Sequence, residues 1–104
     1  MAGHEFYLAV GKAATCEAAK SHRPEPRRFV WHHVLPQACG GETVPGNLVQ
    51  LCDTDHYAIH DLMYRLAHNL PIARPWTRAQ MALARRGYDA AVAAGTADRM
   101  PREG

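Results

Sequence analysis

The sequence lacks a long apolar run, a paired cysteine motif and a strong excess of charge. No stretch of about 18 apolar residues is present, so no membrane-spanning helix is expected. The first eight residues form neither a basic segment nor an apolar run long enough for a signal peptide, which predicts a cytoplasmic location. The formal net charge is only +2, and this value alone predicts no nucleic-acid partner.

Cysteine is scarce and unpaired. The three cysteines are Cys16, Cys39 and Cys52, and an odd number without a secretion signal argues against a disulfide framework. No Cys-x-x-Cys pair occurs, and Asp55 stands where a second thiolate would follow Cys52. A zinc ion held by thiolates is therefore not expected, and Cys52 should be a free, partly buried thiol.

A chain of 104 residues predicts one small domain over residues 1–104. Its core must be small, so a bound metal ion could contribute materially to stability. Residues 1–27 predict a helical extension, with an alanine-rich helix over 12–22 that ends before Pro24. Residues 5–10 suit either a strand or the start of a helix, and the run is too short to decide.

The middle of the chain predicts a β-hairpin followed by a helix. Residues 28–35 are rich in Phe, Val and Trp, which favours a strand that Pro36 ends. A glycine-containing loop over 37–46 leads to a second short strand over 48–52. Asp53 or Thr54 is expected to cap a helix that runs to about residue 69. Its expected buried face follows a spacing of three and four residues and comprises Ile59, Leu62, Met63, Leu66 and Leu70.

A last helix is expected over about residues 77–95. Thr77 and Gln80 form a capping-box pattern, so the helix should begin at Arg78 and run to about Ala94. Gly87 is an expected weak point inside it, and Gly95 is a stop signal. The tail from residue 96 is expected to be loose.

The histidines carry the strongest chemical signal. His56 and His60 are four residues apart in the predicted helix, so their rings should project from one face and could share a divalent metal ion. His32 and His33 are adjacent on a strand, so both can serve one site only if the strand ends or bends there. The alternative is one buried and one solvated histidine.

The His32-His33 doublet, Asn47 and the helical His56 and His60 together resemble the HNH endonucleases, also called ββα-metal or His-metal-finger nucleases. From His33 to Asn47 is fourteen residues, and from Asn47 to His56 is nine. The likeness is greatest to the small single-domain HNH proteins of bacteriophages, and it covers about residues 29–66. It implies an α+β fold with a ββα-metal core over about residues 28–70, a β-hairpin crossed by a helix, with flanking helices.

The resemblance also implies roles for these residues. His32, His56 and His60 would bind one divalent ion (Mg, Mn, Ni or Zn), the last of them matching a His-x-x-x-His variant found in bacterial toxin nucleases. His33 would be the general base that activates water, and Asn47 would hold the loop backbone so that His33 faces the ion. Asp55 could instead bind the ion or orient one of its ligands, and the sequence leaves both roles open.

DNA is the implied partner. Between residues 74 and 86 there are four arginines and no acidic residue, and these arginines could contact phosphates or form a solvated basic face: Arg74, Arg78, Arg85 and Arg86. Trp31 and Trp76 are expected to be packing residues, with stacking on nucleic acid as the alternative.

The family resemblance implies phage contexts such as DNA packaging. Phage packaging proteins are then candidate partners, and the cytoplasm of a bacterium or a phage-infected host is the expected location. The oligomeric state stays open. The competing hypothesis is a non-catalytic nucleic-acid-binding module stabilised by a structural zinc ion. Such a module would not need His33 to be free of the metal.

Overall fold

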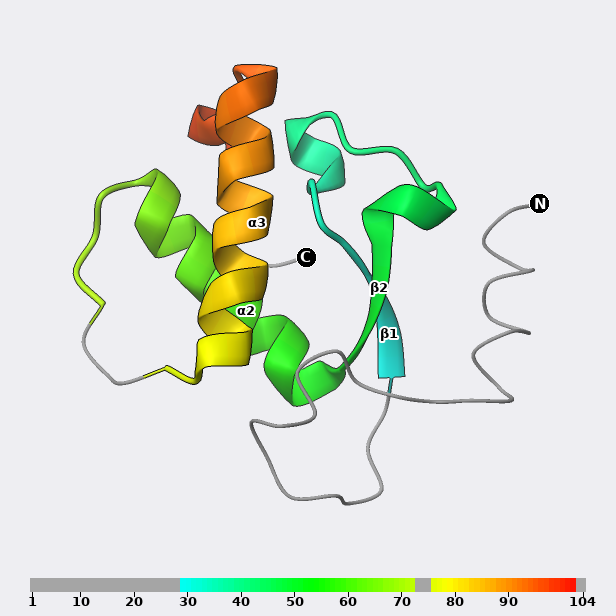
Figure 1. Cartoon of the computed structure of the whole chain (residues 1–104). Helices are drawn as coiled ribbons and strands as arrows, with labels where there is room; N and C mark the ends of the chain where they lie inside the picture. The colour runs from blue at the N-terminus through cyan, green and yellow to red at the C-terminus, as the bar shows by residue number, and fades with distance from the viewer. Residues whose placement is uncertain (1–28, 73–75, 103–104) are drawn as a thin grey trace.

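The computed structural model describes residues 29–72 and 76–102. Strands β1 (Phe29–His33) and β2 (Leu48–Cys52) form an antiparallel hairpin, and helices α2 (Asp53–Ala67) and α3 (Arg78–Ala94) follow. Figure 1 shows α2 and α3 crossing one another with the hairpin beside them. The α+β fold class and the ββα arrangement predicted from the sequence are confirmed. The helical extension expected over residues 1–27 lies outside the described residues.

The hairpin consists of two five-residue strands joined by a long loop. Phe29 pairs with Cys52 and His33 with Leu48 at the two ends of the ladder. The strand expected over residues 28–35 stops at His33, because the backbone of the next residues bonds to Asn47 and not to β2. The connection contains two 3₁₀ turns, Gln37–Cys39 and Pro45–Asn47.

Helix α2 begins directly where β2 ends. Its N-cap is Cys52, whose Sγ accepts a hydrogen bond from the backbone N–H of Asp55 at 3.5 Å, so the expected cap at Asp53 or Thr54 is wrong. The cap moves because Cys52 is the last residue with extended backbone angles before the helix. Of the predicted apolar face, Ile59, Leu62 and Met63 are buried and Leu66 packs against the core. Leu70 is 42% exposed, since the helix has already ended at Ala67.

Helix α3 has the bounds and the capping box that the sequence predicts. Gly87, the expected weak point, lies inside the continuous helix and is a close-packing position. A Cβ atom added there would lie 2.6 Å from the carbonyl oxygen of Val34 and would collide with the sulfur of Met63. The absence of a side chain at Gly87 therefore lets α3 approach the hairpin and α2.

The tail after α3 is docked, contrary to the expectation that it is loose. Thr96 donates a hydrogen bond from Oγ1 to the carbonyl of Cys39 at 2.7 Å. A 3₁₀ turn over Ala97–Arg99 follows, and Met100 is only 2% exposed. Met100 thereby joins a core built from β2, α2 and α3, which includes Leu51, Ile59, Leu62, Met63, Leu83, Ala84 and Ala91.

In the described ranges, no helix has the length and apolar character needed to cross a membrane.

Candidate metal centre

Three imidazoles from two elements converge under the hairpin. His32 comes from β1, and His56 and His60 come from successive turns of α2. One ring nitrogen from each lies within 4.8 Å of the others, and the ring centroids are 4.6–5.3 Å apart. His32 is fully buried and His60 is 4% exposed. The shared face predicted for His56 and His60 is confirmed, and the fold adds His32 to it.

Several nitrogens of this cluster are buried without a bonding partner. Within the described part of the chain, neither ring nitrogen of His32 nor Nδ1 of His60 has a hydrogen bond. Burying unsatisfied polar atoms costs free energy, and a metal ion would satisfy nitrogen lone pairs. The Nε2 atoms of His56 and His60 are 3.1 Å apart, a spacing that fits two nitrogens bound to one ion at about 2.1 Å each. The cluster is therefore suited to hold a metal ion.

The surroundings of the cluster keep its imidazoles neutral, which is the form that binds a metal. Burial, followed by the proximity of His60, His56 and His33, lowers the pKa of His32 to about 2. Burial, with His56 and His33, lowers the pKa of His60 to about 4. The pKa of His56 is lowered by burial and then by His33.

His33 lies beside this cluster without belonging to it. Its side chain lines a cleft of about 420 Å³ together with His56 and His60. Its Nε2 is 2.9 Å from Oγ1 of Thr43, and partial burial lowers its pKa. Neighbouring side chains on β1 point to opposite faces, so His32 points inward and His33 points into the cleft. Both reach one site because His56 and His60 of α2 lie beside His32 and also line the cleft.

Asn47 fastens the loop that carries Thr43. Its Oδ1 accepts from the N–H of Leu35 at 2.8 Å, and its Nδ2 donates to the carbonyls of Leu35 at 3.0 Å and Glu42 at 2.9 Å. Glu42 directly precedes Thr43, so Asn47 anchors the backbone next to the residue whose hydroxyl contacts His33. The predicted bonding of Asn47 to loop backbone is thus present, whereas no local pattern in the sequence pointed to Thr43.

Asp55 does not lie among the three imidazoles. Its carboxylate is 1% exposed and accepts hydrogen bonds from Gln80 of α3 at 3.0 Å and from Sγ of Cys52 at 3.3 Å. Among the described residues, the group able to hold one ion comprises histidines only. Asp55 connects α2 to α3, so direct coordination of the ion does not follow from this structure.

Three of the four arginines expected to contact DNA lie in the described part of the chain. Arg78, Arg85 and Arg86 are exposed on α3, and Arg74 lies outside the described residues. Arg85 is 3.8 Å from the carboxylate of Asp89. Exposure leaves these side chains available to a charged partner and does not identify one.

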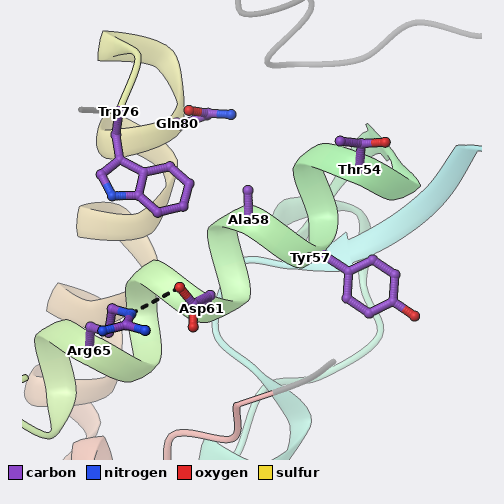
Figure 2. Close-up of a pocket in the computed structure, with 7 residues that line it drawn as sticks. All are labelled: Thr54, Tyr57, Ala58, Asp61, Arg65, Trp76 and Gln80. Carbon is purple, nitrogen blue, oxygen red and sulfur yellow. Dashed lines mark hydrogen bonds and ion pairs between the residues drawn. The ribbon is translucent and has the colours of Figure 1, made fainter. Parts of the chain in front are cut away.

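A second hollow of about 450 Å³ lies between α2 and α3. Figure 2 shows its lining, with Arg65 and Asp61 paired at 3.0 Å and the ring of Trp76 above them. On α2 these residues occupy the helical face turned away from His56 and His60. Of the residues predicted to be catalytic or to bind the metal, none lines this hollow.

Comparisons of the chain with known protein families, with curated proteins and with solved structures find no match.

Proposed function

We propose that this chain is a metal-dependent endonuclease of the HNH kind that hydrolyses phosphodiester bonds in DNA. The observation that carries the proposal is the arrangement of four histidines. Three of them form a buried cluster of ligand atoms, and the fourth, His33, lines the same cleft without joining the cluster. A hydrolytic site needs both parts, because an ion and a proton acceptor have separate tasks.

His32, His56 and His60 are the proposed ligands. Three neutral imidazoles leave coordination positions open for water and substrate, as in catalytic metal sites. Of the candidate ions Mg, Mn, Ni and Zn, a ligand set made of imidazoles favours Ni or Zn. When bound, the ion would stabilise the negative charge that develops on the phosphoryl and leaving oxygens.

His33 is the proposed general base. Its lowered pKa keeps the ring neutral at cellular pH, so that it can take a proton from water. In the tautomer in which Nε2–H donates to Oγ1 of Thr43, Nδ1 is the nitrogen that accepts this proton. Asn47 holds the loop, and through it Thr43, so that the ring keeps its direction.

DNA is the proposed substrate, and α3 is the proposed surface for its backbone. Arg78, Arg85 and Arg86 could neutralise phosphates without reading sequence. Phage packaging proteins remain a proposed class of partner that follows from the family resemblance alone.

The second candidate is a non-catalytic nucleic-acid-binding module stapled by zinc. The complete burial of His32 favours it, because a buried ligand can serve the stability of a small core as well as catalysis. The two functions differ in what they require of His33. A structural site tolerates its loss, whereas a hydrolytic site does not.

A plasmid-nicking assay with metal titration separates these functions. We expect His33→Ala to lose about 10²–10⁴-fold in rate, the usual contribution of a general base, while its metal affinity stays near that of the wild type. The matched variant His56→Ala should lose metal binding and nicking together, and its melting curve should no longer respond to chelator. Unchanged nicking by His33→Ala would contradict the proposed mechanism, and loss of metal from that variant would make His33 a ligand.

A further inference from the structure

We propose that Thr43 and Gln37 are positioning residues for the general base, and that they fix which way the His33 ring faces and which of its nitrogens carries hydrogen. This role rests on the proposed nuclease function, because both residues act through His33. Thr43 lies in the loop between β1 and β2, ten residues after His33, and supplies the hydroxyl that contacts the ring.

The hydroxyl oxygen of Thr43 is contacted from two sides. Nε2 of His33 lies 2.9 Å from Oγ1 of Thr43, and Nε2 of Gln37 donates a hydrogen bond to the same oxygen at 3.4 Å. Gln37 belongs to the first 3₁₀ turn of the loop and also lines the cleft. A half-turn of the His33 ring would place a carbon atom opposite this oxygen, so the contact favours one of the two ring orientations.

The backbone of Thr43 is held on both sides by Asn47. The side-chain Nδ2 of Asn47 donates to the carbonyl of Glu42 at 2.9 Å, and its backbone N–H donates to the carbonyl of Val44 at 2.9 Å. The side chain of Thr43 is exposed, and on an unanchored loop such a hydroxyl would readily exchange its partner for water. Anchoring of both neighbours keeps the hydroxyl in place beside His33, as a group that supports a reacting side chain requires.

The direction of the hydrogen bond between the two side chains decides whether His33 can act as a base. A neutral imidazole has one N–H and one nitrogen lone pair. If Nε2–H donates to Oγ1 of Thr43, the lone pair is on Nδ1 and can take a proton from water. If the hydroxyl donated to Nε2, Nδ1 would carry the hydrogen and neither nitrogen would be free to accept.

The same contact becomes stronger as the reaction proceeds. Once Nδ1 has taken the proton, both ring nitrogens are donors and the ring is cationic, and Oγ1 of Thr43 still accepts from Nε2–H. Hydrogen bonds from a charged donor are stronger than those from a neutral one. An interaction that strengthens toward the transition state raises kcat, whereas uniform binding only lowers KM.

Nuclear magnetic resonance of the histidine side chains tests the contact without DNA. Spectra of ¹⁵N-labelled protein distinguish a ring nitrogen that carries hydrogen from one that does not. In chelator at about pH 7.5, where imidazoles are neutral, His33 should carry its hydrogen on Nε2. Thr43→Val removes the hydroxyl and should move His33 toward the mixture of tautomers of a free imidazole. Hydrogen on Nδ1 in the wild type, or an unchanged His33 signal in the variant, would overturn the proposal.

Nicking kinetics at saturating metal test the consequence for catalysis. Thr43→Val should lower kcat about 10–100-fold, the range for one hydrogen bond to a charged group, with KM and metal affinity near those of the wild type. Thr43→Ser keeps the hydroxyl and should restore most of kcat. Gln37→Ala should lose less than Thr43→Val, because its contact is the longer one. A wild-type kcat in Thr43→Val, or an equal loss in Thr43→Ser, would overturn the proposal.

Val44→Ala is the matched control, since it removes an exposed side chain from the next residue of the same loop and should keep the wild-type kcat. The two proposals fail in different ways. Equal nicking by wild type and Thr43→Val would contradict the role of Thr43 alone. A metal-loaded wild type that never nicks DNA, with hydrogen on Nε2 of His33 that depends on Thr43, would contradict the nuclease function and support the orientation of the ring by Thr43.

Discussion

Lowering the pH from 7 to 5 should destabilise the metal-free protein by about 4 kcal/mol. The cause is the burial of His32 and His60, whose native pKa values are lowered to about 2 and about 4 from an ordinary 6.5. At pH values between these native pKa values and 6.5, the histidines are protonated in the unfolded chain but neutral in the folded chain. Stability therefore rises with pH in this window and is lost as the pH falls below about 6.5.

The magnitude follows from the two pKa values. At pH 5 the unfolded imidazoles are almost fully protonated, whereas both native rings are still mostly neutral. The difference between pH 7 and pH 5 is then about 2 kcal/mol for each ring. The contribution of His60 should level off near pH 4, and that of His32 should continue toward pH 2. A loss of about 4 kcal/mol is a large part of the total stability of a small domain.

Urea unfolding in chelator at several pH values measures this effect. With an m value near 1 kcal/mol/M, typical of small domains, the midpoint should fall by several molar or the protein should unfold in buffer by pH 5. His60→Gln should remove about half of the pH dependence. Asn47→Ala loses hydrogen bonds but no titrating group, so it should lower stability at every pH and keep the slope. An unfolding free energy that is flat between pH 7 and pH 5 would show that the imidazoles titrate as in water.

Three further predictions concern the loop, the arginines and the helix packing. Asn47→Ala should reduce nicking at saturating metal without preventing folding, because the three bonds that fasten the loop are lost; a wild-type rate would refute the clamp. Replacing Arg85 and Arg86 with alanine should weaken DNA binding equally for unrelated sequences and lower the salt dependence in a filter-binding or anisotropy titration; an unaltered slope would place both residues away from DNA. Gly87→Ala should lower the unfolding free energy by about 1–3 kcal/mol, since the added methyl group meets the carbonyl of Val34; a raised melting temperature, as helix propensity alone would give, contradicts the close approach.

The sequence by itself determined the elements whose signals are local. The bounds of β2 and α3 and the capping box from Thr77 to Gln80 are as predicted. The common face of His56 and His60 also follows from helical periodicity alone. These features depend on residues within one or two turns of each other, so they can be predicted from the sequence without knowledge of tertiary contacts.

Only the tertiary structure decided how distant residues meet. The packing of α2 under the hairpin brings His32 to His56 and His60, and it leaves His33 in the cleft. The sequence could pair these residues only through a family resemblance, because their spacing along the chain does not fix their distance in space.

The same reason explains the contacts that the sequence did not reveal. Thr43 reaches His33 across ten residues of loop, and Met100 returns to a core made by elements far earlier in the chain. Gly87 looks weak by helix propensity, yet α3 packs against Val34 at that position. In each case the deciding contact joins segments that are remote in sequence. Such a contact stabilises the protein only after both segments have folded against each other.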